Sequence, residues 1–333
     1  MNHTAFILFT FLFSFQVFGQ QNLILNGDFE EYWECPQALT EIEKCKYVYN
    51  PCYHAQPPSG PPVWSSTSDY FNSCASMPSG CSVPINSFGF QEARSGNGYL
   101  GLSNCDLWSD YREYIQLSFA TVLEPYATYK FSVYVNLTNN GGYTSRNLEF
   151  KFTDNLIYYS DYLSAFLIPD IKIDTLSLTD TMEWKEVSFE YIAKGGEKYL
   201  ILGNFKTSTS GDCIFNHLSS EPLSTDYCYF FFDDASLTKI KDADPIVFPN
   251  IITPNNDGIN DEFRLLSGQD HFEEMIIYNR WGSIVYSSNS YLGWYGQDQS
   301  GNLLSDGVYF VQITGKILKE KNKREQYNGA IHL

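Results

Sequence analysis

Positive charge is scarce in this chain. Its 333 residues include 21 lysines and arginines against 39 aspartates and glutamates, which gives a formal net charge of −18 at pH 7. A surface of this sign repels nucleic-acid phosphates and anionic lipid, and no lysine- or arginine-dense stripe stands out against it. Charged residues make up 18% of the chain and hydrophobic residues 43%, which excludes a disordered protein. The length favours about two domains.

Sequence motifs of catalysis are also missing. The chain has no H-E-x-x-H, no G-x-S-x-G and no P-loop, and its five histidines form no cluster in the sequence. Residues 96–101 match G-x-G-x-x-G, but no strand–helix unit surrounds them, which indicates a glycine-rich turn and strand. The adjacent carboxylates Asp233 and Asp234 point to opposite faces if they lie in a strand, which disfavours a shared acid–base role. We therefore expect no enzymatic activity.

Long apolar runs are confined to the N-terminus. Residues 5–18 are almost entirely apolar and are followed by Gly19 and two glutamines. The run is too short to span a bilayer, and Val17-x-Gly19 is typical of a signal-peptidase site, so residues 1–19 are predicted to be a secretory signal peptide. A buried first strand or helix is the alternative. No later stretch has 18 consecutive apolar residues, so no transmembrane segment is expected in the mature chain.

All eight cysteines follow the predicted signal peptide, and six lie between residues 35 and 105, where proline and glycine abound. An even number of cysteines in an exported chain predicts disulfides. Proximity in the sequence and the isolation of the last pair favour four bonds: Cys35–Cys74, Cys45–Cys52, Cys81–Cys105 and Cys213–Cys228. A zinc site at Cys45, Cys52 and His54 is the alternative, which the absence of a C-x2-C pair and the oxidising compartment disfavour.

From residue 115 onward, apolar residues recur at every second position, as in residues 131–137, 148–152 and 187–191. Turn-forming residues separate these runs, and no stretch shows the 3.6-residue period of an amphipathic helix. The pattern predicts an all-β protein whose large domain is a disulfide-stapled jelly-roll β-sandwich. A polar segment ending at Pro245 marks a domain boundary. The predicted domains are residues 20–241, a linker at 242–248 and a second β-domain at 249–333.

The second domain carries four ordered motifs: F-P-N-I-I-T-P-N-N-D-G-I-N-D from residue 248, I-Y-N-R-W-G from 277, Y-L-G-W-Y-G from 291 and L-S-D-G-V-Y from 304. These motifs closely resemble the gliding motility-associated C-terminal domain, the type B sorting domain of the Bacteroidota type IX secretion system. One departure is Tyr295, where the family more often has an acidic residue. The matching residues are Pro254, Asn255, Asp257, Gly258, Asn260, Asp261, Asn279, Arg280, Trp281, Gly282, Asp306 and Gly307.

The resemblance covers about the last quarter of the chain. It implies a small Ig-like β-sandwich, the type IX secretion machinery as partner, and export across the outer membrane to the cell surface or the medium. Residues 255–261 also offer oxygen ligands around a glycine, as calcium loops do. Their spacing departs from the full calcium-loop pattern, so we favour an asparagine-rich turn that satisfies its own backbone.

Residues 22–30 and 232–237 resemble the first and last strands of galactose-binding-like jelly rolls, which include several carbohydrate-binding modules. A structural calcium is often held where these two strands meet. The resemblance therefore implies a calcium site at Glu30, Asp233 and Asp234, and carboxylate oxygens are suitable ligands for this ion.

A sugar-binding site needs an aromatic face that stacks on the sugar ring, with polar groups beside it. Candidates in the loop-rich region are Trp33, Trp64, Tyr70, Trp108 and Tyr111, although most of the 25 tyrosines, 25 phenylalanines and 6 tryptophans must belong to the core. We expect a non-catalytic secreted or cell-surface binding protein, with glycan as the leading ligand. A structural or adhesive protein that binds a protein partner is the alternative, and a secreted hydrolase is the third.

Overall fold

The computed structural model describes residues 21–51, 68–106, 111–158, 167–174, 178–206, 213–216, 226–244, 246–269, 272–291, 293–316 and 324–333. The predicted signal peptide lies outside them. One large hydrophobic core runs from Ile24 to Leu237, and a second runs from Ile246 to Ile331. Within the described residues, no helix has the length and apolar character needed to cross a membrane.

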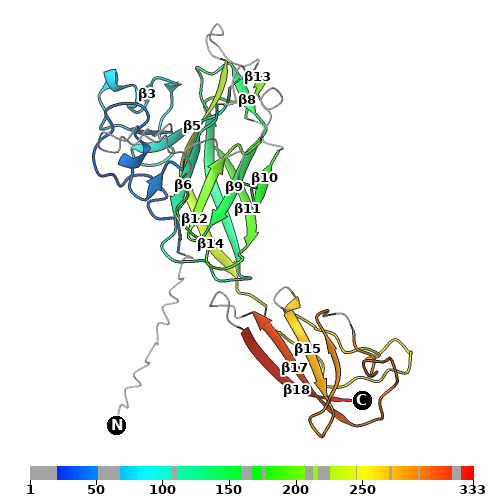
Figure 1. The fold of residues 1–333 in the computed structure, drawn as a ribbon. Helices are drawn as coiled ribbons and strands as arrows, with labels where there is room; N and C mark the ends of the chain where they lie inside the picture. Colours follow the sequence, from blue (N-terminus) through cyan, green and yellow to red (C-terminus); the bar gives the residue numbers. More distant parts are fainter. Residues whose placement is uncertain are drawn as a thin grey trace, which may run out of the picture.

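The larger part is a sandwich of two five-stranded antiparallel sheets (Figure 1). The first sheet has the order β1 (Val48–Tyr49), β6 (Tyr114–Ser118), β12 (Tyr199–Gly203), β9 (Leu148–Thr153) and β10 (Ile171–Ile173). The second has the order β11 (Lys185–Ile192), β7 (Thr128–Leu137), β14 (Tyr227–Lys241), β5 (Gly98–Asp106) and β2 (Asp69–Asn72). The predicted all-β sandwich is confirmed.

Strand β7 shows why this sequence folds into a sandwich. Phe131, Val133 and Val135 are buried between the sheets, whereas Lys130 is exposed. The side-chain period of two in a strand sends these apolar residues to one face. Phe131 packs against Phe150 of β9 at a ring distance of 5.3 Å, which links the two sheets. Each such burial contributes about 1.5–3 kcal/mol.

Short elements decorate the sandwich. They are the 3-10 turns η1 (Ile42–Lys44) and η2 (Met77–Ser79) and the two-stranded pairs β3 (Ile85–Asn86) with β4 (Gly89–Phe90) and β8 (Tyr143–Ser145) with β13 (Cys213–Phe215). A second apolar cluster forms where the segment between β2 and β5 covers the outer face of the second sheet. Phe71, Tyr99 and Phe231 are at its centre.

Two disulfides are present among the described residues. Cys35 bonds to Cys74, as expected, but Cys105 bonds to Cys213 across 108 residues of chain. The expected pairs Cys81–Cys105 and Cys213–Cys228 are therefore wrong. Cys105 of β5 lies directly opposite Cys228 of β14. Cys213 lies opposite Ser145, and the Ser145 backbone makes a hydrogen bond with the Cys228 thiol. Three cysteines thus converge through strand pairing, which proximity in the sequence does not reveal.

Among the cysteines of the described ranges, three are free buried thiols: Cys45, Cys81 and Cys228. The expected Cys45–Cys52 bond is consequently not formed, and Cys52 itself lies outside the described residues. His54, the third ligand of the alternative zinc site, lies outside them as well. Burial raises the pKa of the Cys45 thiol well above its usual value, which keeps it protonated and unreactive.

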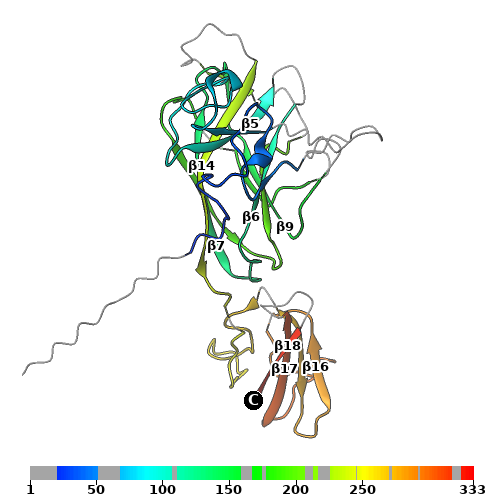
Figure 2. The ribbon, with the colours of Figure 1, turned by 90° about the vertical axis from the view of Figure 1, so that its left-hand side faces the viewer.

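The C-terminal part has one four-stranded antiparallel sheet of order β16 (Ile284–Ser288), β15 (Phe272–Tyr278), β17 (Val308–Lys316) and β18 (Arg324–His332). Figure 2 shows β17 and β18 side by side. One sheet face buries Ile277, Val311 and Ile313 beneath loop segments. Single bridges such as Phe263–Trp294 organise these loops, which form an irregular second layer of the sandwich.

Candidate functional site

A small pocket opens beside β1, at the edge of the first sheet. It has a volume of about 220 Å³ and is lined by Trp33, Glu43, Cys45, Tyr47, Val48, Tyr49, Asn50 and Tyr158. We call it the aromatic pocket. Four of its eight lining residues are aromatic, the composition expected of a surface on which a ring stacks.

The pairing of β1 with β6 decides which side chains enter this pocket. Val48 lies opposite Leu117, and both are buried in the sandwich core. Tyr49 lies opposite Gln116 and, because side chains alternate along a strand, is directed to the outer face of the sheet. Tyr158, from the segment after β9, borders the pocket from another part of the chain.

Tyr47 has a left-handed backbone conformation, with φ of +65°. This conformation costs a tyrosine on the order of 1–2 kcal/mol. The neighbouring backbone holds it in place, since the Tyr47 carbonyl accepts a hydrogen bond from the Ser118 amide at 3.2 Å. Such local strain is often found at functional sites, and here it accompanies an exposed aromatic side chain on the pocket wall.

Trp33 is the most exposed aromatic residue of the pocket, with 71% of its surface accessible. Its backbone is nevertheless fixed, because its amide donates to the Lys44 carbonyl at 2.8 Å. The Lys46 ammonium lies 5.1 Å from the centre of the indole ring and 3.4 Å from a Glu31 carboxylate oxygen. An exposed indole on a fixed backbone, with a cation against it, is a ready stacking platform.

Polar groups accompany these rings. Partial burial raises the pKa of Tyr158, and the nearby Tyr49 and Glu43 raise it further. The Tyr158 hydroxyl therefore remains protonated at neutral pH and is able to donate a hydrogen bond. Glu43 supplies a carboxylate acceptor on the same pocket wall.

The structure does not place any of the four ligand-binding residues predicted from sequence in the aromatic pocket. Trp64 and Trp108 lie outside the described residues. Tyr70 was wrongly assigned: it is buried, and its hydroxyl donates to the Phe29 carbonyl at 2.9 Å. Tyr111 is half-buried and donates to Glu113 at 2.5 Å, outside the aromatic pocket.

Among the named candidates, Trp33 is the one that lines the pocket, while Tyr47, Tyr49 and Tyr158 were missed. The pattern Tyr-Val-Tyr at residues 47–49 was the signal that could have identified Tyr47 and Tyr49. If Val48 faces the core of a strand, the tyrosines on either side of it face outward. Nothing in the sequence indicated that Tyr158 would join them.

Two carboxylates are buried elsewhere in the sandwich. Burial raises the pKa of Asp69 to about 6 and, together with the charge of Asp69, raises the pKa of Glu113 well above its usual value. Asp69 accepts hydrogen bonds from the Thr40 amide and the Tyr229 hydroxyl. The Glu113 carboxylate likewise accepts internal bonds from a backbone amide and a tyrosine hydroxyl. These bonds indicate a structural polar cluster.

Glu30, Asp233 and Asp234, the predicted calcium ligands, flank the segment 94–98. Glu30 accepts the amides of Asn97 and Gly98 at 2.7 and 2.8 Å. Asp233 accepts the Arg94 amide at 2.8 Å, and Asp234 bonds the Arg94 guanidinium. Contrary to expectation, the two aspartates act on the same segment, because Asp234 has a positive φ of 48° at a bulge in β14.

The carboxylates of Glu30, Asp233 and Asp234 are suitable ligands for calcium, but in this structure they accept hydrogen bonds from other residues of the protein. Among the described residues, no three acidic, histidine or cysteine side chains stand close enough to share a metal ion. A calcium ion would have to replace bonds to the segment 94–98 and to Arg94. Burial and then the charge of Asp234 raise the pKa of Asp233 to about 8.

The first sorting motif forms a loop that satisfies its own backbone. The Asp261 carboxylate accepts the amides of Asn256 and Gly258 at 2.6 and 2.7 Å. Asn255 accepts the Asp257 amide at 3.0 Å and donates from its side chain to the Asp257 carboxylate at 2.9 Å. The oxygens that a calcium loop would use are thus bonded within the loop, as in the predicted asparagine-rich turn.

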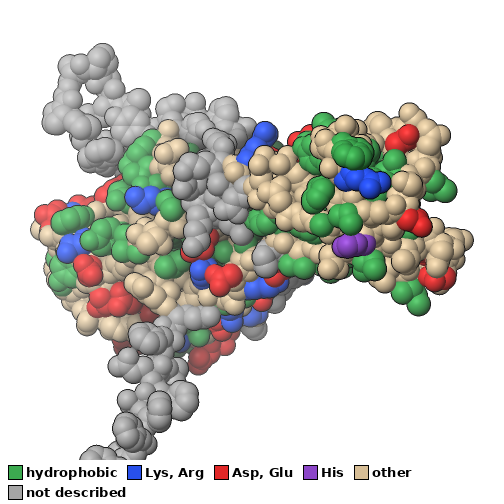
Figure 3. Space-filling model, turned by 90° about the horizontal axis from the view of Figure 1, so that it is seen from below, with side chains coloured by type: hydrophobic (Ala, Val, Ile, Leu, Met, Phe, Trp, Pro, Cys, Tyr) green, Lys and Arg blue, Asp and Glu red, His purple; other side chains and the backbone are tan. Residues whose placement is uncertain are grey.

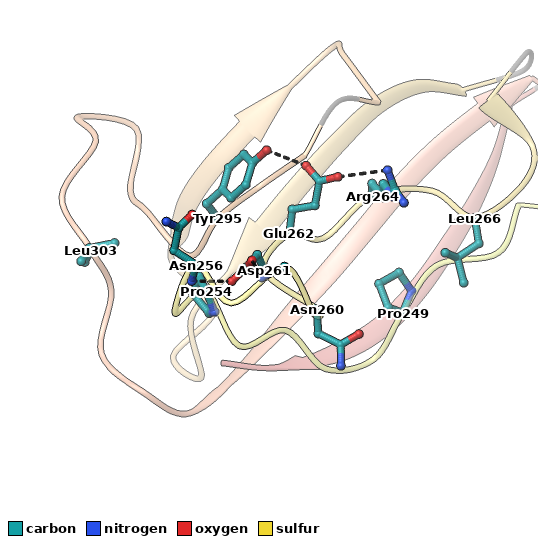
Figure 4. Close-up of a pocket in the computed structure, with 11 residues that line it drawn as sticks. Pro249, Pro254, Asn256, Asn260, Asp261, Glu262, Arg264, Leu266, Tyr295 and Leu303 are labelled. Carbon is teal, nitrogen blue, oxygen red and sulfur yellow. Dashed lines mark hydrogen bonds and ion pairs between the residues drawn. The ribbon is translucent and has the colours of Figure 1, made fainter.

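This loop is one wall of a cavity of about 580 Å³ in the C-terminal domain (Figure 4). On the opposite wall, Glu262 accepts the Tyr295 hydroxyl at 2.6 Å and lies 3.3 Å from the Arg264 guanidinium. Tyr295, the residue that departs from the family motif, thus has a defined partner. Pro249 and Leu266 supply apolar lining.

The second and fourth sorting motifs meet at a neighbouring hollow of about 300 Å³. In the second motif, Asn279 accepts the amides of Trp281 and Ser283, both at 3.0 Å, which fixes the hairpin turn between β15 and β16. Trp281 itself is 80% exposed. Leu303 borders both this hollow and the larger cavity, so residues of all four motifs contribute to one continuous surface.

The open face of the C-terminal sheet continues this surface. Tyr278 lies opposite Ile284 on one side and Phe310 on the other, and Ile284 and Phe310 are 61% and 48% exposed. Figure 3 shows hydrophobic side chains gathered on this domain. Exposed apolar surface of this kind is typical of protein–protein contacts.

Residues 246–333 match the family described as CHU_C Type IX secretion signal domain. This domain marks the chain for export across the outer membrane to the cell surface or the extracellular space, with the type IX secretion machinery as partner. No curated protein matches the sequence.

Several solved structures show weak similarity. The K1 adhesin domain of Lys-gingipain from Porphyromonas gingivalis W83 is 12% identical at a TM-score of 0.28, over 54% of this chain and 84% of that one. The CBM22-1 xylan-binding domain from Paenibacillus barcinonensis is 16% identical at 0.25, over 46% and 78%. The CBM22-1–GH10 modules of a Clostridium thermocellum xylanase are 16% identical at 0.25, over 48% of this chain and a quarter (25%) of that chain.

Proposed function

Because residues 246–333 direct the chain out of the cell, we propose that it acts there as a non-catalytic binding protein whose aromatic pocket holds a sugar. One observation carries this proposal: exposed Trp33 and Tyr47 stand with Tyr158 around a single hollow that also contains a carboxylate. Pockets that bind small molecules are typically lined by aromatic and other apolar side chains together with a few polar groups, and this pocket has that composition.

The chemistry of the pocket suits a pyranose. The C–H face of a sugar ring is apolar and packs on an indole or phenol ring, whereas its hydroxyls need hydrogen-bond partners. Trp33 supplies the exposed ring. The Glu43 carboxylate accepts hydrogen bonds from sugar hydroxyls, and the protonated Tyr158 hydroxyl donates a hydrogen bond to a sugar oxygen.

The alternatives have less support in this domain. A glycoside hydrolase commonly uses two carboxylates that converge on the substrate, but the buried Asp69 and Glu113 are bonded within the protein. Adhesion through a protein partner would use a broad apolar surface, and the open sheet face with Ile284 and Phe310 belongs to the domain that serves export.

The test is a glycan array probed with the chain from Gln20 onward. We expect binding that is lost in Trp33→Ala and retained in Trp281→Ala, a matched control because Trp281 is also largely exposed but lies in the C-terminal domain. Trp64→Ala and Trp108→Ala belong in the same panel. A blank array with folded protein overturns the glycan proposal and moves the search to a protein partner.

A further inference from the structure

We infer that the aromatic pocket selects one uncharged sugar ring at the end of a glycan and rejects acidic sugars. This inference rests on the proposed function and adds the class of ligand. It has two independent supports, which are the size of the pocket and the charge that surrounds it.

The pocket is too small for a chain segment. Its volume of about 220 Å³ lies below the roughly 300–1,000 Å³ of pockets that bury drug-sized ligands. Trp33 and Tyr158 border this short hollow from distant parts of the sequence. One ring fits between such walls, and the rest of the glycan must then leave towards solvent. An internal sugar ring is linked to another sugar on each side, so it needs a groove that is open at both ends.

The charge around the pocket is negative. Residues 31–50, which supply seven of the eight lining residues, contain four acidic residues and two lysines, a balance of 2 − 4 = −2. Neither lysine is available to an acidic ligand as a free cation. Lys44 pairs with Glu34 and Glu41, each at 2.9 Å.

Lys46, the second lysine, lies 3.4 Å from Glu31 and against the Trp33 ring. Glu43 lines the pocket itself. A carboxylate or sulfate on the ligand would approach the Glu43 carboxylate, and both lysines of this segment are already paired with other acidic residues, so the approach brings like charges together at short range. A neutral ring avoids this repulsion, and its hydroxyls donate to the same carboxylate.

The experiment uses the chain from Gln20 and three sets of immobilised glycans: neutral linear oligosaccharides, their uronic-acid or sulfated counterparts, and cyclic oligosaccharides, which have no chain end. We expect the neutral linear set to bind at least tenfold more tightly than either of the others. We also expect Glu43→Gln to reduce the difference in affinity between neutral and acidic glycans, and to reduce it more at low salt, where charge repulsion is less screened. Lys130→Gln, which changes an exposed charge on β7, is the matched charge control.

The outcomes separate this inference from the proposed function. Trp33-dependent binding of acidic glycans, or equal binding of cyclic ones, overturns the selectivity and leaves glycan binding intact. No binding to any set by a folded protein overturns both. A monosaccharide that competes with the neutral linear set supports recognition of a single terminal ring.

Discussion

The Lys46 ammonium lies 5.1 Å from the ring centre of Trp33 and 3.4 Å from a Glu31 oxygen. The lysine thus joins an acidic neighbour to the exposed indole of the aromatic pocket. It neutralises one carboxylate near the pocket and restricts the orientation of the ring. In the proposed function Lys46 would be a positioning residue for Trp33, and Trp33 the residue that contacts the sugar.

Lys46→Met tests this positioning role. The substitution keeps an apolar stem near the indole but removes the cation–π contact, which is worth about 0.5–1 kcal/mol at an exposed site. We expect glycan affinity to fall about two- to fivefold with an unchanged melting temperature, measured by titration calorimetry and differential scanning fluorimetry. Lys130→Met is the control. Unchanged affinity in Lys46→Met would show that the indole is oriented without the lysine.

The two disulfides differ in the length of chain that they close, 39 residues for Cys35–Cys74 and 108 for Cys105–Cys213. Chain entropy predicts a loss of about 4 kcal/mol of unfolding free energy for Cys35→Ser with Cys74→Ser, and about 5 kcal/mol for Cys105→Ser with Cys213→Ser. Urea denaturation measures both.

Peptide mapping under non-reducing conditions checks the pairing directly. It should recover Cys105 linked to Cys213 and Cys228 as a thiol. A Cys213–Cys228 peptide in folded protein would contradict the structure, and Cys81→Ala serves as a control because Cys81 is free.

Asp233 makes stability depend on pH. Its pKa is about 8 in the folded protein, chiefly because of burial, against an ordinary 3.8. Between these values the folded state holds a proton that the unfolded state has released, so the free energy of unfolding falls as pH rises. We expect a decline between pH 6 and 8, at most about 1.4 kcal/mol per pH unit. Urea titrations in EDTA measure it, and Asp233→Asn should flatten the slope.

Calcium provides a second condition for the same measurement. The carboxylates of Glu30, Asp233 and Asp234 are bonded to residues 94–98 and do not form a group that could share a metal ion among the described residues. We therefore expect the same melting temperature with calcium and with EDTA at both pH 6 and pH 8. A calcium-dependent rise that Glu30→Gln abolishes would contradict this and would show that the ion displaces these hydrogen bonds.

Trp281 tests the export surface. The residue is 80% exposed, so Trp281→Ala should change the free energy of unfolding by less than about 0.5 kcal/mol. If the surface formed by the sorting motifs contacts the secretion machinery, the same variant should accumulate inside the cell, with several-fold less protein at the surface or in the medium. Immunoblots of cell fractions measure this. Wild-type export of a stable Trp281→Ala chain would place recognition elsewhere in residues 246–333.

Much of the fold was predictable because its strands and turns depend on residues that are close together in the sequence. The alternation of Phe131, Val133 and Val135 with polar residues specifies a strand with one buried face, and strand β7 follows it. The asparagine-rich turn near Asp261 was predictable for the same reason, since short polar side chains bond to the backbone beside them.

The aromatic pocket and the Cys105–Cys213 bond depend on contacts between distant segments. Tyr158 lines the pocket although it belongs to the segment after β9. Tyr47 lines it with a left-handed backbone conformation that the sequence pattern did not predict. Tyr70 had the right chemistry for a ligand, but its place on β2 buries it. Residue type indicates what a side chain is able to bind, whereas tertiary packing decides whether a ligand reaches it.

The most direct test of a sugar in the aromatic pocket is binding of neutral linear glycans to the chain from Gln20, with wild type and Trp33→Ala measured side by side. We expect saturable binding by the wild type and at least about tenfold weaker binding by a variant with the same melting temperature. Equal binding by both proteins, or none by a folded wild type, would contradict a sugar in the aromatic pocket.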